Sequence, residues 1–155
     1  MSGLTFDHCN YGWTSVVELI VVGATSTPTS EDAASQAAEL AKALGARLHV
    51  VSVVTQRDTT QIHGGGESWV HTSRDEAQQR MSTLRVALGD GFELTTGLVE
   101  GSDPAKALCS DAERLGADLI VVGSVRTQGS GRVLGSVATD VIRRAPCSVL
   151  VAKTA

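Results

Sequence analysis

The sequence predicts an α/β fold in which a five-stranded, parallel, doubly wound sheet lies between two layers of helices. Four short apolar runs, rich in β-branched residues and without polar alternation, are typical of strands covered on both faces. They occupy residues 19–22, 50–54, 119–122 and 149–151. The stretches between them carry apolar residues at helical spacing. With 3% aromatic residues, the core must consist of aliphatic side chains, which suits layered α/β packing.

The first half of the chain begins with a strand at 17–23 and a helix at 30–44, followed by a strand at 47–54. The first helix has an apolar stripe of alanines and leucines, with Thr29 or Ser30 as its expected N-cap. The stripe consists of Ala33, Ala37, Leu40, Ala41 and Leu44. We expect the segment 55–70, with three consecutive glycines, to be a long mobile loop.

The second half continues the alternation of helices and strands. Its three helices, at 71–88, 103–115 and 132–144, each have an apolar stripe, and Ser102 or Asp103 can cap the second of them. The strands are expected at 92–99, 118–123 and 147–152. Right-handed crossovers and strict alternation then give the strand order 3-2-1-4-5, with four helices in a three-layer αβα sandwich.

Composition restricts the classes of partner. The formal net charge of −4 argues against a nucleic-acid partner, which normally meets a basic face. No apolar run approaches the length of a membrane span, and residues 1–16 do not resemble a signal peptide. The three cysteines form no CxxC pair. We therefore expect a cytoplasmic protein with a single domain at 17–155 and an N-terminal arm at 1–16, which is either disordered or packs its rings on the domain or on a partner.

The two loops that follow the strands at 17–23 and 118–123 are candidates for a ligand site. Ligands of doubly wound sheets bind beyond the carboxyl ends of the strands, where the strand order reverses. Both loops are rich in Gly, Ser and Thr, and Gly135-Ser136 at a helix start could hold a phosphate, with Arg126 or Arg132 adding positive charge. The alternative is that these glycines only permit tight turns.

Several segments together resemble the universal stress protein family. They read VELIVVG, EGSDPAKAL, ADLIVVGS and LGSVATDVIRRAPCSVLV, and the resemblance extends from about residue 17 to residue 153. It implies a Rossmann-like domain that forms homodimers through its last strand, at 147–153 here. An apolar edge strand needs such a cover.

Nucleotide-binding members of that family carry a Gly-x2-Gly-x9-Gly-Ser/Thr motif, which this chain matches in part. Gly123 matches the first glycine and Gly135-Ser136 the last pair, but Arg126 replaces the middle glycine and the spacer has eight residues. Thr25 replaces an Asp, and Val53 matches a position whose backbone faces adenine. The candidate site consists of Gly23, Ala24, Thr25, Val53, Gly123, Ser124, Arg126, Gly129, Gly131, Arg132, Gly135, Ser136 and Val137.

The resemblance implies a dimeric stress-response regulator that binds ATP or a related adenine nucleotide, with Mg²⁺. The alternative is an interaction and dimerisation module of the same family that has lost nucleotide binding. Catalysis is poorly supported, with slow ATP hydrolysis at most, because neither G-x-S-x-G nor G-x-G-x-x-G is present. His63, Glu67 and His71 have helical ligand spacing, but three glycines interrupt it and we expect no metal there. We interpret His49 as an edge histidine with a local hydrogen bond.

Overall fold

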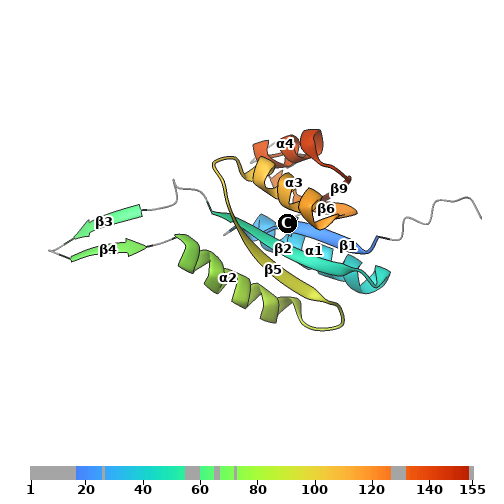
Figure 1. Cartoon of the computed structure of the whole chain (residues 1–155), viewed down its shortest axis with the longest axis horizontal. Helices are drawn as coiled ribbons and strands as arrows, with labels where there is room; N and C mark the ends of the chain where they lie inside the picture. The colour runs from blue at the N-terminus through green and yellow to red at the C-terminus, as the bar shows by residue number, and fades with distance from the viewer. Residues whose placement is uncertain are drawn as a thin grey trace, which may run out of the picture.

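The computed structural model describes residues 17–25, 27–54, 60–64, 67–71, 73–126 and 132–153. Within these ranges the chain forms the predicted sheet and four helices (Figure 1). The expected arm at 1–16 lies outside the described residues, as do the candidate site residues Gly129 and Gly131.

Five parallel strands form the main sheet in the order β5-β2-β1-β6-β9, which confirms the predicted order 3-2-1-4-5. The strands are β1 (Leu19–Gly23), β2 (Arg47–Val54), β5 (Leu94–Glu100), β6 (Leu119–Gly123) and β9 (Ser148–Ala152). β2 and then β5 lie on one side of β1, and β6 and then β9 lie on its other side. The switch point of the sheet therefore lies between β1 and β6.

Two helices cover each face of this sheet. They are α1 (Pro28–Leu44) and α2 (Ser73–Leu88) on one face, and α3 (Pro104–Leu115) and α4 (Ser136–Arg144) on the other. Each pair has its own buried cluster against the strands, and Figure 1 shows α3 and α4 above the sheet and α2 below it. The arrangement is the expected αβα sandwich.

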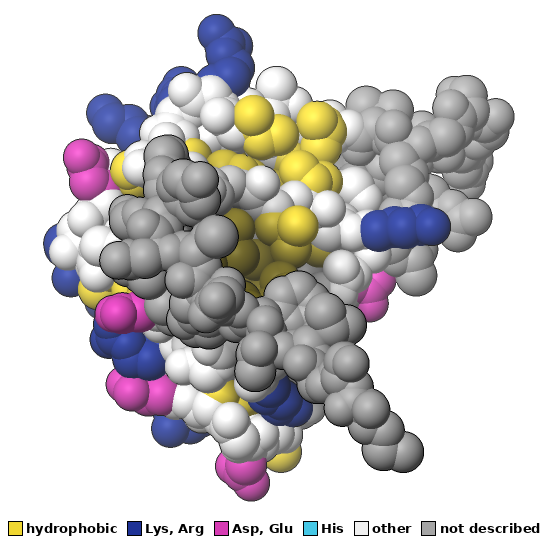
Figure 2. All heavy atoms as spheres, turned by 90° about the vertical axis from the view of Figure 1, so that its right-hand side faces the viewer, with side chains coloured by type: hydrophobic (Ala, Val, Ile, Leu, Met, Phe, Trp, Pro, Cys, Tyr) yellow, Lys and Arg dark blue, Asp and Glu magenta, His cyan; other side chains and the backbone are white. Residues whose placement is uncertain are grey.

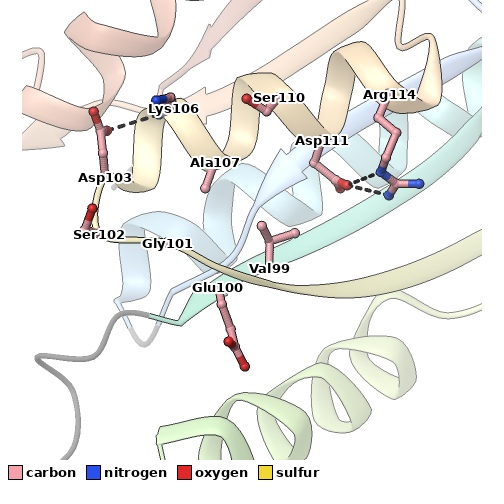
Figure 3. Close-up of a pocket in the computed structure, with 10 residues that line it drawn as sticks. All are labelled: Val99, Glu100, Gly101, Ser102, Asp103, Lys106, Ala107, Ser110, Asp111 and Arg114. Atoms are coloured by element: carbon pink, nitrogen blue, oxygen red, sulfur yellow. Dashed lines mark hydrogen bonds and ion pairs between the residues drawn. The ribbon is translucent and has the colours of Figure 1, made fainter.

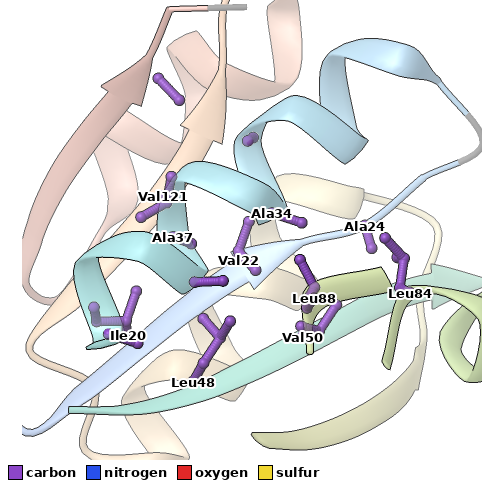
Figure 4. Close-up of a cluster of buried hydrophobic side chains, with 14 of the residues drawn as sticks. Ile20, Val22, Ala24, Ala34, Ala37, Leu48, Val50, Leu84, Leu88 and Val121 are labelled. Carbon is purple, nitrogen blue, oxygen red and sulfur yellow. The ribbon is translucent and has the colours of Figure 1, made fainter. Parts of the chain in front are cut away.

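Small side chains allow α1 to lie close to the sheet. Apart from Ser30, its buried residues are alanines, which pack on Ile20, Val22, Leu48 and Val50 of β1 and β2 (Figure 4). Leu84 and Leu88 of α2 complete this side of the core. Because the helix contributes so little volume, branched aliphatic residues of the strands fill the interior without aromatic rings.

The structure corrects two expected boundaries. The segment expected to be a long mobile loop contains an antiparallel hairpin, β3 (Thr60–Gly64) with β4 (Glu67–His71), and α2 begins after it at Ser73 rather than at residue 71. The last helix begins at Ser136 rather than at residue 132, because residues 132–133 pair with residues 125–126 as strands. Gly64, the first of the three glycines, thus ends a strand and pairs with Glu67.

Figure 2 shows the molecule from the right-hand side of Figure 1. Hydrophobic side chains gather in the upper middle of this face, and positive and negative side chains are interspersed toward its periphery. Among the helices that the structure describes, none is long and apolar enough to cross a membrane.

Candidate functional site

The carboxyl ends of β1 and β6 lie side by side at the switch point. Val22 pairs with Val121, so Gly23 and Gly123 end neighbouring strands. Beyond them, the N–H of Ala24 donates to the carbonyl of Val51 at 2.7 Å, and Ser124 donates likewise to Ala152 at 3.0 Å. Both Ala24 and Ser124 are buried, so the start of each loop is fixed by the sheet. These four predicted site residues, Gly23, Ala24, Gly123 and Ser124, are brought together.

A network of hydroxyl groups shapes the loop after β1. The N-cap of α1 is Thr27, not the expected Thr29 or Ser30, because Pro28 takes the first helical position. Ser30 is instead buried, and its Oγ accepts the N–H of Thr25 at 2.7 Å and donates to the carbonyl of Gly23 at 3.2 Å. Thr25 is exposed, and its Oγ1 lies 3.0 Å from that of Thr27. The loop thus presents a hydroxyl where the family motif has a carboxylate.

The loop after β6 is built as a two-stranded ribbon. β7 (Val125–Arg126) pairs antiparallel with β8 (Arg132–Val133), and Arg126 stands opposite Arg132. Arg126 therefore has an extended backbone, and no non-glycine residue in the described part of the chain has a positive φ. An extended position accepts any side chain, so the glycine of the motif is not needed for backbone conformation at position 126.

The N-terminus of α4 has no side-chain cap. Gly135 is the N-cap residue, with φ −64° and ψ 163°, and its carbonyl accepts both the N–H and the Oγ1 of Thr139. Ser136 and Val137, which begin the helix, are exposed. The first N–H groups of a helix lack partners within the helix and form an anion site when nothing caps them. Val53 lies at the end of β2, two residues after the partner of Gly23, with its side chain half-buried against the α3 side of the core.

A separate groove of about 400 Å³ runs between α3 and β5 (Figure 3). Asp103 caps α3 at its mouth: one carboxylate oxygen accepts the N–H of Lys106 at 3.1 Å, and the other binds Arg144 of α4 at 2.7 Å. These two donors, led by the backbone N–H, hold the pKa of Asp103 below its usual value. At the other end of the groove, Figure 3 shows Asp111 bound to Arg114.

A chain of polar side chains lies beside this end of the groove. His49 of β2 is buried, with its Nδ1 2.7 Å from Thr95 Oγ1 and its Nε2 3.4 Å from Asp111 Oδ2. The second contact is longer than an ordinary hydrogen bond, and neither Nε2 nor Oδ2 has a hydrogen-bond partner within the described residues. Asp111 Oδ1 accepts from Arg114 Nε at 3.1 Å. Burial lowers the pKa of His49, although the nearby Asp111 carboxylate opposes this effect.

The expectation of an edge histidine is therefore wrong. β2 is an inner strand, flanked by β1 and β5, and the buried His49 lies near the start of β2 with its ring toward Asp111 of α3. Two signals in the sequence could have indicated the pair: a histidine inside an apolar strand, and Asp111 next to the apolar stripe of its helix. Two polar groups buried on facing elements stabilise the fold only when they meet.

The pH dependence of stability is expected to report on His49. Its pKa is lowered in the folded protein, so on acidification the unfolded chain binds the proton first. The contribution of His49 to the free energy of unfolding should therefore be constant above about pH 7.5 and should fall as the pH drops through and below about 6.5. Urea denaturation at a series of pH values measures this effect.

His49→Gln is the matched variant for this measurement, because it keeps a polar side chain that does not titrate. Its free energy of unfolding should vary less between about pH 7.5 and 5 than that of the parent protein. The carboxyl of Asp103 contributes only near and below its ordinary value of 3.8, outside this window. Parallel curves for the two proteins would contradict the assignment to His49.

Comparisons with known proteins agree with this architecture. The model of the universal stress protein family matches residues 17–153. The chain belongs to the universal stress protein family. A universal stress protein of Methanocaldococcus jannaschii is 33% identical over 139 residues, which cover 86% of this chain and 81% of that protein. The resemblance seen in the sequence motifs is thus confirmed.

Solved structures of universal stress proteins have the same fold. One, in complex with cAMP, superposes with a TM-score of 0.67 at 27% identity, covering 91% of this chain and all of that one (100%). Another, from Archaeoglobus fulgidus in complex with dAMP, has a TM-score of 0.60 at 27% identity and covers 88% of this chain and 98% of that one. Both of these proteins bind an adenine nucleotide.

Proposed function

We propose that this universal stress protein binds an adenine nucleotide at the switch point between β1 and β6 and acts as a dimeric regulator of a stress response in the cytoplasm. The observation that carries the proposal is the uncapped N-terminus of α4 at Gly135, at the end of the segment that leaves the carboxyl end of β6, the strand paired with β1. Two structurally similar proteins, in complex with cAMP and dAMP, support the class of ligand.

Each part of the nucleotide has a candidate partner among the residues at this edge. The phosphate would bind the first N–H groups of α4, beginning at Ser136, where the helix dipole favours an anion. The exposed hydroxyl of Thr25 can donate to or accept from a ribose hydroxyl. The backbone at Val53 would face the base. Contacts through the backbone suit a domain with few aromatic rings to stack on a base.

The residues at this edge fit a nucleotide better than they fit a free metal ion. In the described part of the chain, no group of three His, Cys, Asp or Glu side chains could hold a metal. Mg²⁺, which keeps several waters and is commonly bound through substrate phosphates, would therefore arrive with ATP. Gly129, Gly131, Arg126 and Arg132 complete the proposed site, with the two arginines adding positive charge near the phosphates.

The proposed interface between the two copies of the dimer consists of residues 147–153. β9 is the last strand on its side of the sheet, and Leu150 and Val151 are exposed on it. Three further exposed apolar side chains lie in α4 or just before it: Leu134, Val137 and Ile142. An apolar edge strand beside an apolar helix face is typical of a surface that a second copy covers.

Thermal unfolding in the presence of AMP, cAMP or ATP, each with and without Mg²⁺, tests nucleotide binding. Ligand at a hundredfold excess over its Kd should stabilise the folded protein by about 2.7 kcal/mol and raise its Tm. If no adenine nucleotide at millimolar concentration changes the Tm, nucleotide binding is disproved and the interaction module remains.

Gly135→Asp is the sharpest variant for the phosphate position. An Asp at the N-cap can accept a first-turn N–H, so the free protein should be as stable as the parent or more stable by a few tenths of a kcal/mol. The same carboxylate blocks and repels a phosphate, so the nucleotide-induced rise in Tm should disappear. An undiminished rise in Tm would mean that the phosphate does not bind at α4.

A further inference from the structure

We propose that Thr95 is the nucleophile of an acyl-transfer site, with His49 as its general base and Asp111 as the residue that positions the base. The three side chains come from β5, β2 and α3 and stand in sequence: Thr95 Oγ1 lies 2.7 Å from His49 Nδ1, and His49 Nε2 lies 3.4 Å from Asp111 Oδ2. A hydroxyl, a base and a group that orients the base are the parts of an activated nucleophile. The site is independent of the proposed nucleotide site at the switch point.

The neighbours of His49 determine which ring nitrogen carries its proton. The Asp111 carboxylate accepts hydrogen bonds only, so the proposed site has the proton of the neutral ring on Nε2, which lies 3.4 Å from Oδ2 and can approach it to donate. Nδ1 then has a free lone pair and accepts the proton of the Thr95 hydroxyl. Arg114 binds the other carboxylate oxygen of Asp111 and keeps that side chain in place. With its proton on Nε2, the ring can act as a general base, because the unprotonated Nδ1 faces the Thr95 hydroxyl.

The surroundings keep this base both rigid and unprotonated. Burial favours the neutral imidazole, and Asp111 and Arg114 are the charged groups that act on it. Gly97 of β5 leaves the space that the ring occupies, since a Cβ there would lie 2.9 Å from His49 Nε2. Thr95 itself is exposed, so a small reagent can reach its hydroxyl from solvent.

The edge of β5 also offers a donor for the oxyanion. Leu48 donates to the carbonyl of Glu93, and Gly101 donates to that of Val54, so the odd-numbered residues of β5 direct their backbone groups toward β2. By the alternation of a strand, the N–H of Thr96 points away from β2, and β5 is the last strand of the main sheet on this side. The N–H of the residue after a nucleophile is a common oxyanion donor.

The substrate class is a small activated acyl ester. Thr95 Oγ1 bonds to the acyl carbon while its proton moves to His49 Nδ1, and the bond from that carbon to the leaving oxygen then breaks. The proton passes from His49 to the leaving oxygen or to solvent. The products are an ester on Thr95 and the free alcohol or phenol. Attack of water on that ester, with His49 again taking the proton, restores Thr95 and releases the acid.

Reaction of the intact protein with p-nitrophenyl acetate tests the proposal. Release of p-nitrophenolate gives the rate, and mass spectrometry of peptides locates the acetyl group. We expect acetylation of Thr95, at a rate that falls as acid protonates His49. His49→Gln should lower the rate at Thr95 about a hundredfold, the lower end of what general-base catalysis contributes. Asp111→Asn should shift the pH profile, which a merely structural role would leave unchanged.

Thr83 of α2 provides the matched control, because it is a threonine outside the proposed site. It is also exposed, and its Oγ1 donates to the carbonyl of Gln79 at 3.1 Å within its own helix. Thr83→Val should leave the rate unchanged, Thr95→Val should abolish it, and Thr95→Ser should retain it. Thermal unfolding of each variant separates loss of reaction from loss of fold. Equal acetylation of Thr95 and Thr83, or an unchanged rate in folded His49→Gln protein, would overturn the proposal.

Discussion

Val151→Lys is expected to dissociate the proposed dimer through β9 into monomers. Val151 lies on the outermost strand β9 with 36% of its surface exposed, beside Leu150 with 37%. In an interface of twofold symmetry each copy can lose only the burial of the third of Val151 that is exposed, about 0.5–1 kcal/mol. The two losses weaken dimerisation by about 1–2 kcal/mol, roughly five- to thirtyfold in Kd, and the desolvation of two Lys ammonium groups weakens it further. Native mass spectrometry over a dilution series measures the change and reports any co-purified nucleotide as well.

Val86→Lys is the matched control, because Val86 is an apolar residue that is 82% exposed on α2, a helix that packs on β2 and β5. It receives the same charge and should leave the dimer intact. Lysine is well tolerated on edge strands, so the Tm of diluted Val151→Lys protein should stay near that of the parent monomer. If the parent protein is itself a monomer, or if both variants remain dimers, the dimer through β9 is wrong.

The sheet could be predicted from the sequence because its strands are short apolar runs that are buried on both faces. All five strands and their order are confirmed, and Gly45 and Gly116 end α1 and α3 in the left-handed conformation, as their positions after apolar stripes indicate. Such signals are local: they depend on the alternation and composition of neighbouring residues. Local signals are what a single sequence records best.

The start of α4 could not be predicted from the same kind of signal. Leu134 continues the helical spacing of Val137 and Val141, yet it precedes the N-cap. The competing interaction is the ribbon formed by β7 and β8, in which Arg132 pairs with Arg126. Pairing across a loop depends on the path of the chain, which hydrophobic spacing does not encode. The same ribbon explains how an arginine replaces the motif glycine without a positive φ.

The two candidate sites also differ in how far local sequence signals could locate them. The topology of a doubly wound sheet indicates the loops after β1 and β6, so Gly23 and Gly123 could be located from the sequence. The cluster of Thr95, His49 and Asp111 could be located only in part: His49 and Asp111 each have a local signal of burial, but the contacts among three residues far apart in the chain do not follow from those signals. Burial of both His49 and Asp111 is the reason that they meet, and it becomes visible only when α3 packs on the sheet.

Gly97→Ala is expected to destabilise the protein by about 1–3 kcal/mol, the range for overpacking a filled core. The added Cβ would lie 2.9 Å from His49 Nε2 and 3.2 Å from Cε1. The ring cannot move away easily, since it is buried and its Nδ1 is held by Thr95. Alanine is otherwise tolerated well in this backbone, because Gly97 is not among the glycines with a positive φ. Urea denaturation measures the loss.

A double-mutant cycle with His49→Ala tests whether the imidazole is the cause. Removing the ring leaves a cavity over Gly97, so in that background Gly97→Ala should cost little or should stabilise the protein by partly filling the cavity. The coupling between the two positions should reach about 1 kcal/mol or more, as for residues in direct contact. Additive losses would mean that strand propensity, rather than contact with the ring, explains the effect of Gly97→Ala. A strong coupling would instead show that the missing side chain at Gly97 leaves the space in which the His49 ring lies beside Thr95.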